Sequence, residues 1–387
     1  MINDNYLVED ALKAWVQGEK PKELPEDANC GRLGRLALQE LSARGQGGEA
    51  PSFFSFMARF PTHRSFFLYW QAYSSVGNGS LESVGDLAES VLQEKTWSDN
   101  WSAEKLWIEF LLDVGEYGAA EKFLDYFPET PQSTYWRLRL ASLVEESDLT
   151  VPVQTVNLDW AQKRWELQSA VFDRAGYQSL VRCQAVNGKA LPQGFLNRIV
   201  SKPSIPGDIG LGAVGAWLSH YKRWEEIASS DHDYVVVIED DMVPHSGPGR
   251  LGRLVGKMEA QGLDFLWVAS SKSRLPYAIW KWDDVFLDPY DLVNRGSSMR
   301  TGWGADGYIL TPETAAVFLE LAEKQLISGH VDGQLAAWTT VVTSEPRVPL
   351  TRFIKEFQAA LGKRPSIKAA SLAVPIVKTL DFGSTTR

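Results

Sequence analysis

The 387-residue sequence has few cysteines, no long apolar run and no excess of positive charge. Its two cysteines, Cys30 and Cys183, lie far apart, which excludes a disulfide framework and a cysteine-rich metal site. No stretch approaches the roughly eighteen apolar residues of a membrane span. The first residues carry acids where a secretory signal has a basic and then an apolar region. We therefore expect a cytoplasmic protein, either free or peripheral at the inner membrane surface.

The formal net charge of −10 argues against a surface built for general nucleic-acid binding. A basic segment nevertheless follows Thr351, and such segments contact anionic membrane surfaces or nucleic acid, or simply form a solvated terminal face. We predict a basic C-terminal extension over residues 351–387 and do not favour nucleic acid as a partner. The basic residues of this segment are Arg352, Lys355, Lys363, Arg364, Lys368, Lys378 and Arg387.

The first 150 residues predict helices. Residues 66–77 and 106–115 each carry apolar side chains at helical spacing, end at Val-Gly, and precede a second amphipathic segment. Gly77 and Gly115 lie 38 residues apart, slightly more than one tetratricopeptide repeat. We predict an all-α helical-repeat, tetratricopeptide-like domain over residues 1–150. It would bind a partner protein or a second copy of the chain, or serve as a helical cap for the following domain.

From residue 151, strand patterns alternate with helical ones. Residues 151–159, 178–188 and 234–243 have the pattern of strands, and residues 162–176 and 213–230 that of amphipathic helices. This alternation predicts an α/β domain with a mostly parallel sheet over residues 151–350. Ligands of such sheets bind at the carboxyl ends of the strands. Asn157, Asp159 and the acids 239–241 should therefore face one crevice.

Three consecutive acids end the apolar strand YVVVIEDDMV. Adjacent carboxylates raise one another's pKa unless a cation or hydrogen-bond donors compensate. If the strand continues through them, Glu239 and Asp241 point one way and Asp240 the other, so the first two can share a divalent ion with water and phosphate oxygens. Capping of the next loop is the alternative. A metal-dependent phosphatase or nuclease also fits this pattern.

The segment GLGAVG, residues 210–215, matches the dinucleotide fingerprint letter by letter. That fingerprint requires a strand immediately before it, and the preceding residues contain two prolines, which are poor strand material. We therefore reject a nicotinamide cofactor. The glycines are expected to form a turn that brings the backbone close to a ligand as it enters the next helix.

The segments VNLDWAQKRWELQ, AVNGKAL, GDIGLGAVGAWLSHYKRWEEI, VVVIEDDM, GWGADGYILTPETAAVFLELA and GHVDGQLAAW follow one another in a characteristic order. Together they resemble glycosyltransferase family 25, which includes bacterial lipooligosaccharide galactosyltransferases and animal procollagen galactosyltransferases. The resemblance covers residues 151–338 and none of the helical part. It implies a GT-A fold, a UDP-linked sugar donor, and transfer with inversion at the anomeric carbon.

The resemblance also implies roles for individual residues. The acidic metal motif falls on Glu239, Asp240 and Asp241, with Asp241 the best ligand for Mn²⁺ or Mg²⁺. The segment 302–308, with Gly304 and Asp306, would close over donor and acceptor. Arg164 is added because it can reach the diphosphate, although a solvated helix face is the commoner position. The predicted donor-binding residues are Asn157, Asp159, Arg164, Ser219, His220, Glu239, Asp240 and Gly304.

Inversion needs a general base at the acceptor hydroxyl and a cation at the leaving diphosphate. We predict Asp332 as this base, with Asp306 as the alternative; a helix N-cap is nearly as good an explanation of Asp332. His330 is a third candidate metal ligand, although single histidines are more often packed or exposed. His220 lies inside an amphipathic helix, where it either contacts a strand-end acid or ligand, or simply packs.

We therefore expect a metal-dependent inverting glycosyltransferase that moves a hexose, galactose or glucose, from a UDP-sugar to a glycan acceptor such as lipopolysaccharide core. The same chemistry on protein or modified phage DNA is one alternative. Another is an inactive transferase fold that acts as an adaptor, which the retention of all three acids opposes. A metal-dependent hydrolase would leave the other segments unexplained.

Overall fold

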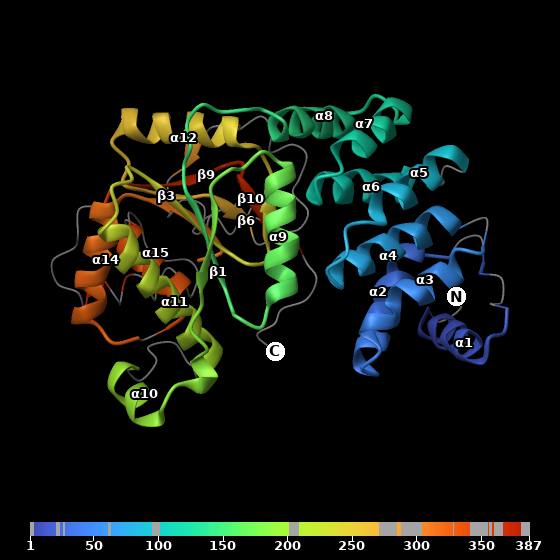
Figure 1. Ribbon diagram of the computed structural model, residues 1–387, viewed down its shortest axis with the longest axis horizontal. Coiled ribbons are helices and arrows are strands. Elements are labelled where there is room, and N and C mark those ends of the chain that lie inside the picture. Colours follow the sequence, from blue (N-terminus) through green and yellow to red (C-terminus); the bar gives the residue numbers. More distant parts are fainter. Residues whose placement is uncertain are drawn as a thin grey trace. The chain divides into compact units, whose positions relative to one another are not determined.

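The computed structural model describes residues 4–20, 24–25, 28–60, 63–94, 101–200, 209–270, 285–287, 304–327, 329–340, 355, 358–359 and 367–380. The chain divides into two compact units, Met1–Leu140 and Ala141–Arg387. The first unit is helical, and the second combines a mixed sheet with helices (Figure 1). This division lies ten residues before the domain boundary predicted from the sequence.

The first unit consists of helices joined by short connections. The helices predicted over residues 66–77 and 106–115 are present, as are the amphipathic segments that follow them. The predicted all-α character is therefore confirmed. The helices are α1 (Asp4–Gln17), α2 (Cys30–Ala43), α3 (Ala50–Met57), α4 (Arg64–Gly77), α5 (Val84–Glu94), α6 (Ser102–Asp113), α7 (Tyr117–Tyr126) and α8 (Pro131–Leu143), with a 3₁₀ turn at Gly47–Glu49.

A tryptophan hydrogen bond recurs between the helices of this unit. The indole of Trp70 in α4 donates to the Cys30 carbonyl at the start of α2, at 3.2 Å. The indole of Trp107 in α6 donates to the Ser65 carbonyl at the start of α4, at 3.1 Å. A Cβ atom at Gly34 would lie 2.1 Å from Trp70 Nε1, so the glycine makes room for the first indole. This tryptophan hydrogen bond thus recurs after nearly the same number of residues as separates Gly77 from Gly115.

The second unit is built on a seven-stranded sheet in the order β2-β1-β3-β8-β5-β9-β7. Strands β2, β1, β3, β5 and β9 run in one direction, and β8 and β7 run in the other. The predicted mostly parallel sheet is thus present with two reversed strands. The strands are β1 (Val153–Asn157), β2 (Leu180–Gln184), β3 (Val235–Glu239), β5 (Phe265–Trp267), β7 (Phe286–Leu287), β8 (Gly307–Leu310) and β9 (Ala369–Leu372).

Helices cover both faces of this sheet (Figure 1). On one face, α11 (Leu211–Ala228), α14 (Pro312–Lys324) and α15 (Val331–Thr339) pack on Val235 and Val237 of β3 around the rings of Trp224 and Trp338. On the other lie α9 (Gln162–Arg174) and α12 (Pro248–Gln261). All four residues of VVVI are buried because β3 lies between β1 and β8 and is covered on both sides.

A small sheet in the order β4-β10-β6 corrects the predicted basic extension. Strand β10 joins this sheet and β9 joins the large one, so residues 369–380 are part of the fold. Lys378 in β10 is fully buried and adds no charge to a surface. Most of residues 351–366 and all of 381–387 lie outside the described residues. The strands are β4 (Met242–Pro244), β6 (Ala269–Ser270) and β10 (Val377–Thr379).

The glycines of GLGAVG have a packing role. Only Gly210 precedes α11, whereas Gly212 and Gly215 lie inside the helix, so the predicted turn is wrong. A Cβ atom at Gly215 would lie 2.6 Å from the Val186 carbonyl oxygen, and one at Gly188 would lie 1.7 Å from the Leu211 carbonyl oxygen. These two glycines therefore let the loop AVNG pack directly on the helix backbone, and the two sequence segments are two sides of one contact.

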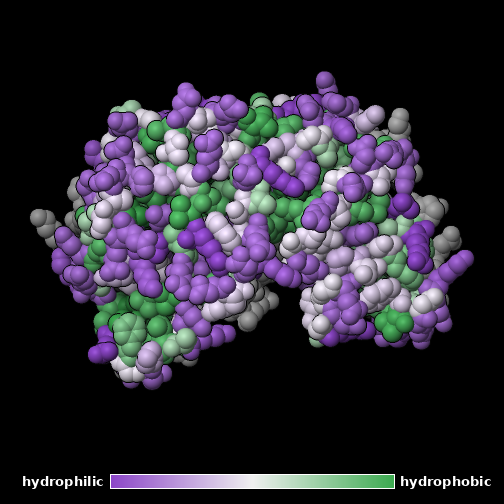
Figure 2. All heavy atoms as spheres, viewed as in Figure 1, coloured by the Kyte–Doolittle hydropathy of each residue, from purple (hydrophilic) through white to green (hydrophobic). Residues whose placement is uncertain are grey.

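The face drawn in Figure 2 is covered mostly by hydrophilic side chains, between smaller apolar areas. None of the described helices combines the length and apolar character needed to cross a membrane.

Candidate active site

The three acids lie at a turn. Strand β3 ends at Glu239, the next two residues form the turn, and β4 begins at Met242. The strand does not continue through the acids, so the premise of strict alternation is wrong. The side chains nevertheless have different neighbours: Asp240 contacts β1 and α9, and Glu239 lies beside α11.

Asp240 is held by two residues that we predicted to bind the donor. Its Oδ2 accepts from Asn157 Nδ2 at 2.7 Å, and its Oδ1 accepts from Arg164 Nη1 at 3.0 Å. The Arg164 side chain is 22% exposed, so it does not lie on a solvated helix face. Asn157, at the end of β1, is almost fully buried. Asp240 is thus a fixed, paired carboxylate that ties β3 to β1 and α9.

Strand β2 supplies two residues that the sequence did not reveal. Arg182 Nε donates to Asn157 Oδ1 at 2.9 Å, and its guanidinium also reaches the carbonyls of Leu158 and Asp159. Gln184 Nε2 donates to Asp159 Oδ2 at 2.6 Å. Because the parallel register sets Asn157 opposite Gln184, the ends of both strands form one polar edge. Asp159 itself is exposed there, as expected of a ligand-contacting residue.

His220 is buried behind Glu239. Its Nδ1 lies 2.8 Å from the Tyr308 hydroxyl, whose oxygen accepts from Trp224 Nε1 at 3.0 Å. With the hydroxyl proton directed at Nδ1, the His220 Nε2 carries its own proton toward Glu239 Oε1, 3.9 Å away. Burial lowers the pKa of His220 to about 4, although the charge of Asp332 opposes this shift. His220 is therefore a neutral, buried side chain that lies next to Glu239. Both predicted alternatives apply to it: it packs inside the unit, and it lies beside a strand-end acid.

Ser219, in contrast, is committed to the fold. Its hydroxyl accepts from the Val186 amide at 2.7 Å and donates to the Gly215 carbonyl at 2.7 Å. The side chain is buried and links α11 to the AVNG loop. These contacts give the hydroxyl a packing role, and the predicted role of Ser219 in donor binding stays a prediction.

The remaining acids come from two other segments. Asp332 lies in the first turn of α15, and its Oδ1 accepts from the Ala305 amide at 3.1 Å. The N-cap residue of this helix is His330, which is exposed, so the N-cap explanation of Asp332 is wrong. A Cβ atom at Gly304 would lie 2.6 Å from Asp306 Oδ2, so this glycine makes room for the carboxylate. Residues 302 and 303 of the predicted closing segment lie outside the described residues.

Burial and the negative charges of neighbouring acids raise the pKa of Glu239 and of Asp306. Burial raises the pKa of Glu239, and the charges of Asp241, Asp332 and Asp240 raise it further. Burial also raises the pKa of Asp306, again with contributions from Glu239, Asp332 and Asp241. Within the described part of the chain, no group of three or more His, Cys, Asp or Glu side chains is arranged to hold a metal ion. The cluster thus concentrates negative charge without forming a closed metal cage.

The sequence of this unit matches a known family over the same segments. Residues 152–332 match glycosyltransferase family 25, described as an LPS biosynthesis protein family. This match covers 181 of the 387 residues, all of them in the α/β unit. The resemblance drawn over residues 151–338 is thereby confirmed, and the chain carries a glycosyltransferase. No curated protein shows significant similarity to the chain.

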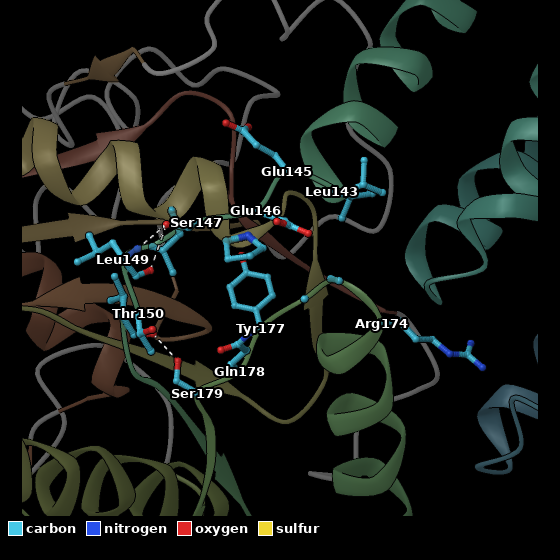
Figure 3. Close-up of a pocket in the computed structure, with 16 residues that line it drawn as sticks. Leu143, Glu145, Glu146, Ser147, Leu149, Thr150, Arg174, Tyr177, Gln178 and Ser179 are labelled. Carbon is cyan, nitrogen blue, oxygen red and sulfur yellow. Dashed lines mark hydrogen bonds between the residues drawn. The ribbon is translucent and has the colours of Figure 1, made fainter.

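A cavity of this unit lies at the opposite ends of the strands from the acids. It has a volume of about 390 Å³ and is lined by Thr150 before β1, Ser179 before β2, and Tyr177 (Figure 3). In this view the Arg174 guanidinium points away from the other labelled side chains. The acids follow the carboxyl ends of the strands, whereas this cavity lies at the amino ends. Within the α/β unit it is therefore separate from the candidate active site.

Proposed function

We propose that the chain is a metal-dependent inverting glycosyltransferase with a GT-A-type fold. It would transfer a hexose, galactose or glucose, from a UDP-sugar to a glycan acceptor such as lipopolysaccharide core. One observation carries the proposal: acids from three separate segments gather at the carboxyl end of β3, where burial and their mutual charge raise the pKa of Glu239 and Asp306. Such crowding is costly in an empty site and is offset by a cation and its diphosphate ligand.

The residues present fit Mn²⁺ or Mg²⁺. The donor set consists of carboxylate oxygens, which both ions prefer, and Mg²⁺ is usually held by one or two carboxylates together with substrate phosphates. A closed cage of three protein ligands is therefore not required. Asp241 and Glu239 would hold the ion, with His330, two residues before Asp332, as a further candidate. The ion would supply positive charge to the leaving diphosphate.

The chain's own residues would arrange the rest of the reaction. Arg164 and Asn157 fix Asp240 and with it the turn that carries Asp241. We keep Asp332 as the general base because its carboxylate is anchored on the Ala305 amide at the start of a helix. From there it would take the proton of the acceptor hydroxyl as the bond to the sugar forms. Asp306, one residue from Ala305, is the alternative base.

The helical unit is proposed as a tetratricopeptide-like module that binds a partner protein or a second copy. The recurring tryptophan ties of α4 and α6 support a repeat, since each joins one helix to the start of the helix two before it. The cytoplasmic location remains a prediction.

The test is calorimetric titration of a panel of UDP-sugars, with and without Mn²⁺, on the wild-type chain and on Asp241→Ala. We expect one donor to bind, and only when both the metal and Asp241 are present. Failure of every nucleotide sugar to bind under all conditions would contradict the proposal. Metal-independent binding to both proteins would contradict the assigned role of Asp241.

A further inference from the structure

A buried glutamine of α9 holds both ends of the acidic turn. Gln168 is 2% exposed, and its Nε2 donates to the Glu239 carbonyl at 2.8 Å and to the Met242 carbonyl at 3.0 Å. Those two carbonyls flank Asp240 and Asp241. Both amide hydrogens of one side chain are thus used to clamp the segment that carries the proposed metal ligands.

The orientation of this amide is also fixed. Thr155 in β1 is fully buried, and its hydroxyl donates to Gln168 Oε1 at 2.6 Å. The carbonyl oxygen of the amide therefore points at β1, and the nitrogen has to point at the turn. A flipped amide would set a carbonyl oxygen against two others. The carbonyls of Glu239 and Met242, which only accept, thus fix which end of the amide faces the turn. The Thr155 hydroxyl satisfies the other end and also lies 3.4 Å from the Glu239 carbonyl oxygen.

Two side chains of α9, four residues apart, form hydrogen bonds with the acidic turn. Arg164 holds the side chain of Asp240, and Gln168, four residues later on the same face, holds the backbone. Burial by itself does not require a glutamine, because a leucine of similar size would fill this space. A leucine would, however, leave two buried carbonyls without this donor, which costs about 1–3 kcal/mol for each unsatisfied group. The polar side chain is needed for the turn, not for the packing.

We propose that Gln168, hydrogen-bonded to Thr155, is a positioning residue for the metal and diphosphate end of the reaction. It touches no substrate and acts by fixing the direction in which Glu239 and Asp241 present their carboxylates. The expected effect on metal binding rests on the proposed function. Its structural part, the clamped turn, is measurable without any ligand.

The experiment compares Gln168→Leu and Thr155→Val with the wild-type chain and a control. Gln193→Leu is the matched control, since Gln193 is exposed on α10 (Gln193–Ile199) and donates only to Asn197 of its own helix among the contacts described. The first readout is hydrogen–deuterium exchange of the peptide covering residues 239–244 in the ligand-free protein. The second is the affinity for Mn²⁺ in the presence of UDP, followed by electron paramagnetic resonance.

We expect faster exchange confined to the turn, and Mn²⁺ binding weakened about 10- to 100-fold in Gln168→Leu, as is typical when a group behind a metal ligand is lost. Thr155→Val should show a smaller change. The double variant should be little worse than Gln168→Leu, because the shorter contact of Thr155 is with the glutamine at 2.6 Å and its direct contact with the Glu239 carbonyl is 3.4 Å long. The control should match the wild type. If Gln168→Leu does not fold, Thr155→Val carries the same comparison.

Wild-type exchange at the turn in both variants would overturn the inference, as would faster exchange spread over β1 and β3, which indicates general destabilisation. Equal Mn²⁺ affinity of wild type and Gln168→Leu would also overturn it. Failure of the wild type itself to bind Mn²⁺ with UDP would instead sink the proposed function, and with it the claim about metal positioning.

Discussion

The two units bury charge in opposite ways. In the helical unit, the fully buried Arg139 lies between two acids, Asp113 at 2.6 Å and Glu109 at 3.3 Å. Trp136 donates to the same Glu109 at 2.6 Å. In the α/β unit, Asp240 is paired with Arg164. Burial and then the charges of neighbouring carboxylates raise the pKa of Glu239 and Asp306.

We interpret the paired charge of the helical unit as structural and the crowded acids of the α/β unit as the candidate active site. A buried charge whose neighbours compensate it adds to a unique fold and needs nothing from outside. Crowded acids weaken the fold that holds them unless an external cation arrives, and that unmet requirement is typical of binding and catalytic sites. The comparison predicts opposite responses when one charge is removed from each region.

The largest effect is expected in the helical unit. Arg139→Met should leave Glu109 and Asp113 buried without their cation and lower the free energy of unfolding of this unit by about 3–5 kcal/mol. The thiol of Cys30 in α2 reports on this unit, because burial raises its pKa to about 12 and keeps it unreactive in the folded state. Alkylation of Cys30 against urea concentration measures the change.

Two controls accompany this variant. Lys122→Met removes an exposed ion pair with Glu89, whose side chains are 59% and 44% exposed, and should change stability by less than about 1 kcal/mol. Cys183 in β2, whose pKa burial also raises, reports on the α/β unit in the same experiment. Equal loss in Arg139→Met and Lys122→Met would refute the structural role of the buried network.

Next in size is the removal of one acid from the crowded site. Asp241→Asn should reduce turnover about 10²–10³-fold, since in the proposed mechanism it removes a carboxylate that holds the cation at the leaving diphosphate. The metal-free protein should be no less stable, because one repulsive carboxylate has been removed. Release of UDP measures turnover, and thermal unfolding without metal measures stability. A variant that is both inactive and strongly destabilised would make Asp241 structural, as Arg139 is.

A smaller loss of activity is expected from Gly304→Ala. The new Cβ atom would meet the Asp306 carboxylate at 2.6 Å and displace it. Displacement of a positioned group by about 1 Å costs up to roughly 100-fold in rate, so we expect a loss of about 10- to 100-fold with little change in stability. Gly256→Ala in α12 is the control, because nothing lies within 4 Å of its added Cβ. Wild-type turnover in Gly304→Ala would remove Asp306 from the site.

The smallest effects separate packing from ligand binding along GLGAVG. Gly215→Ala would force a Cβ atom within 2.6 Å of the Val186 carbonyl and should destabilise the α/β unit by about 1–3 kcal/mol. Gly212→Ala, with nothing within 4 Å, should stabilise it by about 0.5–1 kcal/mol through helix propensity. Urea unfolding followed by Cys183 alkylation measures both. An unchanged midpoint for Gly215→Ala would contradict the close helix–loop contact.

Local patterns predicted the elements well where they were long or strongly apolar. Periodicity and composition alone predicted the helices around residues 66–77 and 106–115 and an apolar strand before the three acids, but not the end of that strand at Glu239. The two strands within residues 369–380 were not predicted, because the basic composition of the segment after Thr351 was taken to indicate a terminal extension. Lys378, one of its basic residues, is in fact buried in a short strand. Strands of three or four residues carry too little pattern to outweigh a composition argument.

The sequence by itself determined that acids follow a buried strand of an α/β domain, and the order of its segments indicated a glycosyltransferase. Only the tertiary structure decided which acid is paired, which is crowded and which glutamine holds the turn. Asn157 and Arg164 reach Asp240 across 83 and 76 residues of chain, and Gln168 reaches Met242 across 74. Such partners depend on strand register and on the direction of each side chain. Those are fixed by packing over the whole unit, because no local stretch of sequence contains both members of a pair.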